Sequence, residues 1–199
     1  MAHQQNFAYW LRMAKLARAI SLETSLGRLT VQVSVNGESI AADSLSLTSS
    51  AFEPSLPVGM QVVNCRAVLI SVERSASRFT INYSATLETE VEGGSCTGQF
   101  LEAIEWEDQR ARIVVGTEDA EQLSRRMPWQ DLKPDDVIAR YSASALELSL
   151  VGNPHSQQTT FHLIVAENPV PEPAPDSAWF AVDSPHKSVL NVTKANICT

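Results

Sequence analysis

Polar and apolar residues alternate with a period of two along much of the chain. In the segment 29–35, leucine and valine occupy the odd positions and polar residues the even ones. In the segment 79–91, Phe79, Ile81 and Tyr83 begin an apolar face, while the opposite face is polar. Because the side chains of a strand point alternately to its two faces, both segments predict β-strands with one buried face.

The segment 58–72 is apolar in both of its alternating sets. Val68 and Ile70 belong to one set, and Cys65 and Leu69 to the other. This pattern is typical of a central strand with both faces covered. Shorter apolar stretches predict further strands over residues 96–108, 112–116, 145–151 and 159–166. Residues 100–106 also fit a helical period, and we interpret them as strand.

Turn signals connect these strands into hairpins. Asn36-Gly37 suits a type I′ turn and predicts a hairpin into residues 39–47. Gly93-Gly94-Ser95 predicts a turn that returns the chain along 79–91, and Gly152-Asn153-Pro154 predicts one between the last two strands. Residues 44–57 are rich in serine and proline, which predicts a loop.

Two segments have a helical period instead. Apolar residues recur at three- and four-residue steps over residues 4–20, which predicts an amphipathic helix. It could pack across the β domain, dock a partner or lie on a membrane surface. A short helix is predicted near 118–127, with Thr117 as its N-cap, arginines in its last turn and Pro128 after it.

The fold class that follows is β-rich α+β. We expect a mainly antiparallel β-sandwich or open barrel of seven to nine strands, with the N-terminal helix and the short helix added. The expected divisions are an amphipathic helix over 1–28, a β-rich domain over 29–167, a proline-rich linker over 168–176 and a tail over 177–199.

The linker and tail indicate an interaction device. Proline occupies every second position from Pro169 to Pro175, which holds the backbone near polyproline II. Beyond it, Trp179, Phe180 and Val182 are apolar. We interpret them as anchors of a recognition peptide. The alternatives are a disordered tail and a tail that folds back into a groove of its own domain.

Composition limits the location and the partners of the chain. The three cysteines are odd in number and widely spaced, which favours reduced thiols. No run of about twenty apolar residues predicts a transmembrane segment, and basic residues interrupt the apolar N-terminal stretch, so we expect a cytoplasmic protein. The formal net charge is −8, which disfavours nucleic-acid binding because phosphates would repel the acidic body.

The acidic groups are concentrated in one part of the sequence. Between residues 88 and 108 there are seven acids and neither lysine nor arginine. If the glycine turn pairs the two segments, these acids converge on one hairpin, as a solvated sheet edge or as a docking face for a basic partner. They are Glu88, Glu90, Glu92, Glu102, Glu105, Glu107 and Asp108.

No motif predicts a reaction, a cofactor or a metal ion. Cys96 follows a glycine turn, but the nearby acids would raise its pKa and no nucleophile signature surrounds it. His155 and His162 are seven residues apart, a spacing that suits neither a helical nor a strand ligand pair. Phosphate-binding glycine loops and the serine-hydrolase elbow are absent from the sequence.

The leading hypothesis is therefore a non-enzymatic protein-binding module that acts through the acidic hairpin and the aromatic tail. An inhibitor or immunity-type protein for a basic partner is one form of it. A small-molecule-binding protein or small enzyme with a pocket between the sheet faces is the first alternative. A structural subunit of a larger assembly is the second, and the sequence leaves the oligomeric state open.

Overall fold

A computed structural model describes residues 13–38, 43–73, 79–91, 93–98, 101–134, 136–152 and 158–197. These residues form eleven β-strands in two sheets, three α-helices and one 3-10 helix. Every strand pair is antiparallel. The β-rich α+β class and the sandwich-like arrangement are thus confirmed.

The first sheet has five strands in the order β1-β2-β5-β10-β9. Their bounds are Met13–Thr24 for β1, Gly27–Glu38 for β2, Phe79–Leu87 for β5, Ala145–Gly152 for β10 and Ala139–Ser142 for β9.

The second sheet has six strands in the order β3-β4-β11-β8-β7-β6. Their bounds are Leu45–Ala51 for β3, Asn64–Glu73 for β4, Gln158–Pro169 for β11, Ala111–Glu118 for β8, Leu101–Glu107 for β7 and Gly93–Gly98 for β6.

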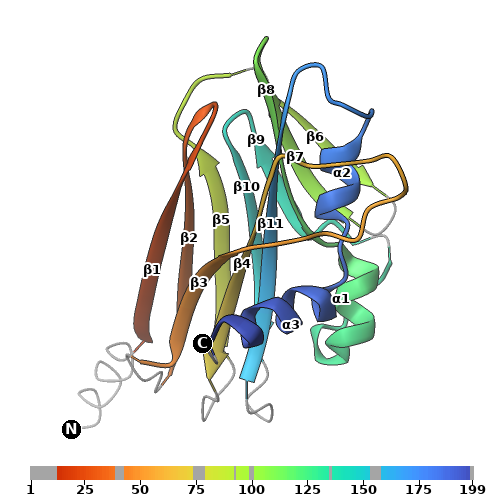
Figure 1. The fold of residues 1–199 in the computed structure, drawn as a ribbon. Helices are drawn as coiled ribbons and strands as arrows, with labels where there is room; N and C mark the ends of the chain where they lie inside the picture. Colours follow the sequence, from red (N-terminus) through yellow and green to blue (C-terminus); the bar gives the residue numbers. More distant parts are fainter. Residues whose placement is uncertain are drawn as a thin grey trace, which may run out of the picture.

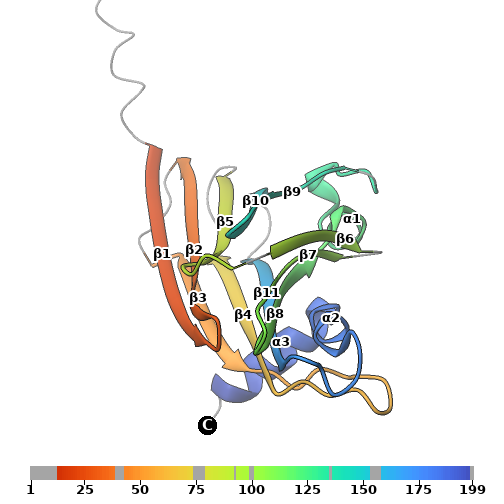
Figure 2. The ribbon, with the colours of Figure 1, turned by 90° about the horizontal axis from the view of Figure 1, so that it is seen from above.

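The two sheets face each other across the main hydrophobic core (Figure 2). Its largest fully buried side chains are Trp106, Tyr83 and Phe161. Trp106 also links the sheets, because its indole Nε1 donates to the carbonyl of Ala143 at 2.9 Å. At the other edge, Arg18 on β1 donates to the carbonyl of Leu45 on β3.

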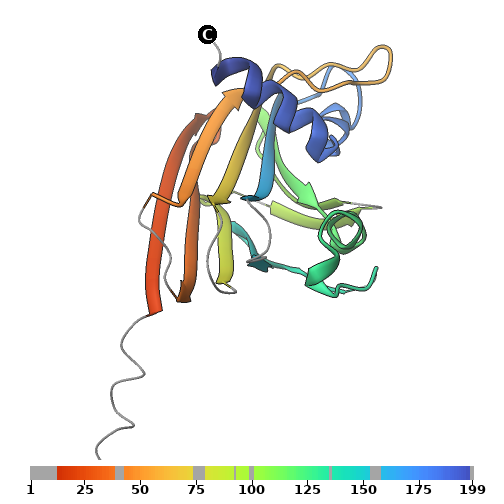
Figure 3. The same ribbon diagram turned by 90° about the horizontal axis from the view of Figure 1, so that it is seen from below.

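Helices cover the outer face of the six-stranded sheet. Helix α3 (His186–Ile197) crosses β3, β4 and β11, and α2 (Ser177–Val182) lies beside it over β8 and β11 (Figures 1 and 3). A second hydrophobic core fills the space beneath them and includes Ala178, Ala181 and Val182. Helix α1 (Ala120–Arg126) and the 3-10 helix η1 (Pro128–Gln130) follow β8.

Several predicted elements are confirmed. Residues 79–87 form a strand whose burial alternates strictly, and β4 is an inner strand with buried residues on both faces, as the pattern over 58–72 predicted. Strand β7 confirms the interpretation of 101–107. Helix α1 confirms the short helix near 118–127, with Asp119 rather than Thr117 as its N-cap.

The prediction of an N-terminal helix is wrong over residues 13–20, because these residues belong to β1. Its remaining residues, 4–12, lie outside the described part of the chain. Leu16 and Ile20 pack against the main core, and Leu22 is buried in it. The predicted helical stripe included Ala17 and Ile20, but Ala17 is exposed, and positions 16, 20 and 22 lie on one face of a strand. Pairing with β2 along all of β1 decided between the two periods.

Three predicted hairpins are also wrong. Asn36 and Gly37 lie inside β2, opposite β1 on one side and β5 on the other, so ladders on both sides hold them extended. Gly93-Gly94-Ser95 belongs to β6, which pairs with β7 and not with β5. The last two predicted strands, β10 and β11, lie in different sheets. The loop predicted over 44–57 contains β3.

Residues 177–197 do not project from the body, although the proline run predicted a spacer and a separate tail. Strand β11 continues to Pro169, opposite Ala111, and Val170 donates its backbone N–H to the carbonyl of Arg110. The chain then turns back onto the six-stranded sheet through α2 and α3 (Figure 1).

In the described residues, no helix is long and apolar enough to cross a membrane.

Candidate functional site

The acidic residues of the predicted hairpin are divided between the two sheets. Glu88 follows β5 and lies near Arg28 and Thr30 of β2, with the Thr30 hydroxyl 3.0 Å from its carboxylate. Glu102, Glu105 and Glu107 instead lie on β7 of the other sheet. The predicted convergence is therefore wrong, because β5 and β7 do not pair. Glu90 is exposed, and Glu92 lies outside the described residues.

Contacts within the chain engage most of the acids near β7. Arg112 lies 2.6 Å from Glu107 and 3.9 Å from Glu105. Arg110 lies 2.7 Å from Asp108, and its hydrogen bonds lower the pKa of that carboxyl. Glu102 is buried and accepts a hydrogen bond from the Tyr141 hydroxyl. Burial raises the pKa of Glu102. These acids are parts of the fold, and their role in protein binding stays a prediction.

The three predicted anchors of the tail differ in how far their side chains are buried. Val182 is 1% exposed, and a methyl group at Gly116 of β8 would meet its Cβ at 2.9 Å. Trp179 is half-buried and donates its indole N–H to Glu105 at 2.7 Å. Phe180 keeps 47% of its surface exposed. Of the three, Phe180 alone has a largely accessible side chain.

A buried polar cluster lies where β8, β11 and α3 meet. It contains Glu118, His162 and His186, each less than 10% exposed. The Nδ1 atoms of the two histidines are 2.8 Å apart. Oε2 of Glu118 lies 3.8 Å from Nδ1 of His162 and 3.9 Å from Nδ1 of His186.

The surrounding residues fix this cluster in place. Arg126 of α1 donates hydrogen bonds to both carboxylate oxygens of Glu118 and to the carbonyl of Thr160, the last at 2.8 Å. The Thr160 hydroxyl is 2.9 Å from Nε2 of His186. Burial lowers the pKa of His162 to about 4, and burial with the neighbouring His162 lowers that of His186 to about 2. Both imidazoles are therefore neutral near pH 7.

The sequence alone did not bring these residues together. The alternation over 159–166 predicts that His162 and Phe161 lie on opposite faces of the strand. The structure confirms this, because Phe161 is buried in the main core and His162 in the polar cluster. His186 carries no such signal, because it is 24 positions away from His162 and starts a helix that was not predicted. His155, considered with His162 as a metal-ligand pair from the sequence, lies outside the described residues.

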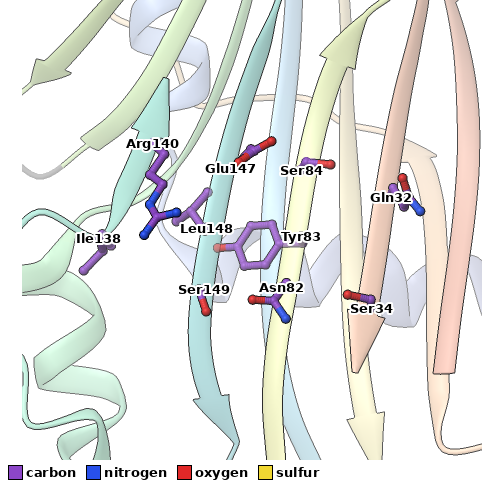
Figure 4. Close-up of a pocket in the computed structure, with 10 residues that line it drawn as sticks. All are labelled: Gln32, Ser34, Asn82, Tyr83, Ser84, Ile138, Arg140, Glu147, Leu148 and Ser149. Carbon is purple, nitrogen blue, oxygen red and sulfur yellow. The ribbon is translucent and has the colours of Figure 1, made fainter. Parts of the chain in front are cut away.

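A polar pocket lies on the outer face of the five-stranded sheet. It has a volume of about 400 Å³. In Figure 4, Ile138 and Arg140 lie at one end and Gln32 and Ser34 at the other. Between them are side chains of β5 and β10, namely Asn82, Ser84, Glu147 and Ser149.

The pocket suits hydrogen bonding better than covalent chemistry. Its lining offers hydroxyls, amides and one cross-strand pair of opposite charges, Arg140 and Glu147. Among the described residues that line it there is neither histidine nor cysteine, the residue types that most often activate or act as a nucleophile.

Comparisons with known proteins leave the family open. No protein-family model matches the chain, and no curated protein or solved structure is significantly similar to it.

Proposed function

We propose that the protein is a non-enzymatic binding module that holds a protein partner against the outer face of its five-stranded sheet. The observation that carries this proposal is the unequal covering of the two sheets. Helices α2 and α3 cover the outer face of the six-stranded sheet. Over the described residues, no helix covers the outer face of β2, β5 and β10 (Figure 3).

The composition of the open face supports binding through hydrogen bonds. Strand β5 presents Thr80, Asn82, Ser84 and Thr86 along its partly exposed side. Protein interfaces that form and dissociate are about as polar as the rest of a protein surface and contain many hydrogen bonds. The pocket of about 400 Å³ gives this face the concavity in which a protruding side chain of a partner could be buried.

The net charge of −8 favours a partner with a basic surface. Long-range attraction of this kind raises association rates more than it raises affinity. Arg112 and Arg110 form ion pairs with Glu107 and Asp108, two of the acids that the sequence pattern assigns to docking. In this proposal the acidic groups therefore steer the partner, while the open sheet face contacts it.

The main competing function is binding of a small molecule, and a subunit role in a larger assembly is the second. The space between the sheets is filled by core side chains such as Trp106 and Phe161. A small ligand in the outer pocket would meet the same polar groups as a protein partner. The experiment must therefore show whether the outer face of the five-stranded sheet binds a protein or a small molecule.

The test is site-specific photo-crosslinking in the native cell, followed by binding measurements on the purified pair. A photoreactive residue at Ser84 should give one dominant protein adduct, and the same residue at Ser46 on β3 should not. The purified partner should then bind the wild-type chain, and Ser84→Arg should weaken that binding by more than about tenfold, since a hot-spot loss exceeds 1.4 kcal/mol.

Ser46→Arg is the control, because Ser46 is an exposed serine on a strand of the other sheet, whereas Ser84 is partly exposed. It should leave affinity unchanged. Equal crosslinking at both sites, or an affinity that ignores Ser84→Arg, would reject the open face as the binding surface. A small molecule that copurifies with the chain and is lost in Ser84→Arg would favour the competing function instead.

A further inference from the structure

We propose that Glu118, His162 and His186 form a binding site for one divalent transition-metal cation of the zinc class, which ties α3 to the six-stranded sheet. Two imidazole nitrogens and one carboxylate oxygen are a ligand set that zinc commonly takes in proteins. The three ligands come from β8, β11 and α3, so the ion would join elements that are far apart in the sequence.

The distances within the cluster match the size of such an ion. The three candidate ligand atoms form a triangle with sides of 2.8, 3.8 and 3.9 Å. The point equidistant from them lies about 2.1 Å from each atom, which is the usual length of a zinc–nitrogen or zinc–oxygen bond. That point lies in the plane of the three atoms, so binding of a water or a small anion as fourth ligand would move the ion out of this plane toward the tetrahedral geometry of zinc.

Hydrogen bonds hold Glu118 and the histidine pair separately but do not link them, because both oxygens of Glu118 accept from Arg126. One shared proton can join the two Nδ1 atoms at 2.8 Å. Oε2 of Glu118, however, lies 3.8 and 3.9 Å from the two Nδ1 atoms, too far for a hydrogen bond. The three atoms nevertheless surround one point. A cation at that point would link all three.

The neighbouring residues support the ligands as an outer shell does in metal sites. Metal-bound histidines usually donate their second ring N–H to an oxygen, which fixes the ring and its tautomer. The Thr160 hydroxyl, 2.9 Å from Nε2 of His186, is such an acceptor and leaves Nδ1 for the ion. Arg126 holds the carboxylate of Glu118 through both oxygens and so fixes the direction of Oε2.

The ion would act on the fold of the covered sheet. His186 is the first residue of α3, and α3 lies across β3, β4 and β11 (Figures 1 and 3). Coordination would therefore fix the start of this helix on β8 and β11. The site lies on the covered sheet and the proposed partner surface on the open one, so the two proposals can fail independently.

Titration of the full chain with Co²⁺ tests the proposal. The protein is first treated with a chelator and dialysed, then titrated while its visible absorption is recorded. We expect one equivalent to bind, with the d–d bands of a four-coordinate ion, no thiolate charge-transfer band, and displacement by Zn²⁺. The melting temperature should rise with Zn²⁺ concentration, because an ion that binds only the folded state stabilises it.

Variants locate the site within the chain. His162→Gln, His186→Gln and Glu118→Gln each remove a ligand and should weaken binding by more than tenfold. Thr160→Val, which removes the partner of Nε2, should weaken it by about tenfold. His155→Gln and Glu121→Gln are matched controls that should bind like the wild type, since Glu121 pairs with Arg125 outside the cluster.

The wild-type protein gives a second readout if a ligand variant does not fold. X-ray absorption at the metal edge should detect two imidazoles, oxygen ligands and no sulfur around the bound ion. A wild-type chain that binds no stoichiometric Co²⁺ or Zn²⁺ overturns the proposal. So does a sulfur neighbour, or binding that His155→Gln removes and His162→Gln leaves intact.

Discussion

The two sheets of this protein differ in how many of their faces are buried. Strands β4 and β11 of the six-stranded sheet have buried residues on both faces, whereas β5 of the five-stranded sheet alternates buried and partly exposed positions along its whole length. Apolar side chains therefore fill two cores around one sheet and a single core beside the other.

This difference separates positions that the fold constrains from positions that it leaves free to vary. On the six-stranded sheet, a changed side chain must fit against α2, α3 or the main core, so the covered sheet is sensitive to volume and charge. On the open face of the five-stranded sheet, side chains end in water and can change at little cost to folding. A binding surface can vary there without loss of the fold.

The largest effect is expected when the cover of the six-stranded sheet is removed. A chain that ends at residue 176 lacks α2 and α3, so Ile164, Ala166 and Val114 lose their covering side chains. We expect it to lose cooperative thermal unfolding and to bind a hydrophobic dye, measured by circular dichroism and fluorescence. Phe180→Ser, at an exposed position of α2, is the control and should unfold cooperatively. Unchanged melting after truncation would mean that α2 and α3 are dispensable for the body.

The second effect is a loss of stability in mild acid. The pKa of His162 is lowered to about 4 in the folded chain and returns to its ordinary value of 6.5 on unfolding. The unfolded chain therefore binds more protons below pH 6.5, so the stability is complete above that pH and falls as the pH drops toward 4. For His162 the loss should be about 1.5 kcal/mol between pH 6.5 and 5, because its imidazole in the unfolded chain is half protonated at pH 6.5 and each further pH unit corresponds to about 1.4 kcal/mol.

Urea unfolding of the chelator-treated protein across this pH range measures the effect. His186 should contribute in the same direction, because its pKa is lowered to about 2. His162→Gln should reduce the slope, and His155→Gln should leave the contribution of the buried pair intact. Stability that does not change between pH 7 and 5 would contradict the burial of neutral histidines in the folded chain.

A smaller loss is expected from one added methyl group on the covered side. A Cβ at Gly116 would lie 2.9 Å from Val182 and 3.0 Å from Leu101, closer than carbon atoms pack. Gly116→Ala should therefore lower the free energy of unfolding by about 1 to 3 kcal/mol. In the Val182→Ala background the same change should cost somewhat less, because Cγ2 of Val182, one of its two crowding atoms, is gone while Cβ remains. Equal costs in both backgrounds would show that Cγ2 of Val182 does not contribute to the crowding.

The smallest effect compares two serines, one on each sheet. The hydroxyl of Ser71 on β4 is buried and has no hydrogen-bond partner among the described residues. Ser71→Ala should raise the free energy of unfolding by up to about 1 kcal/mol, since it removes an unsatisfied buried group. Ser84→Ala on the open face should change it by less than about 0.5 kcal/mol. A loss of stability in Ser71→Ala would indicate that its hydroxyl has a partner, such as a bound water.

The sequence determined the elements whose signal is local. Alternation over 79–91 and the apolar sets over 58–72 follow from which side chains must leave water, and they predicted β5 and the two-sided burial of β4. The arginines and the proline around 125–128 likewise predicted the end of α1, because dipole and steric effects act within one turn.

Only the tertiary structure decided how these elements were assembled. Asn36-Gly37 has a turn preference, but two ladders hold it in β2, and Ala17 and Ile20 fit a helical stripe although pairing with β2 makes this segment a strand. The same holds for the candidate site, where Glu118, His162 and His186 meet because β8, β11 and α3 pack together. Local preferences amount to about 1 kcal/mol per residue, whereas sheet pairing and burial act over whole strands, so the long-range contacts prevailed.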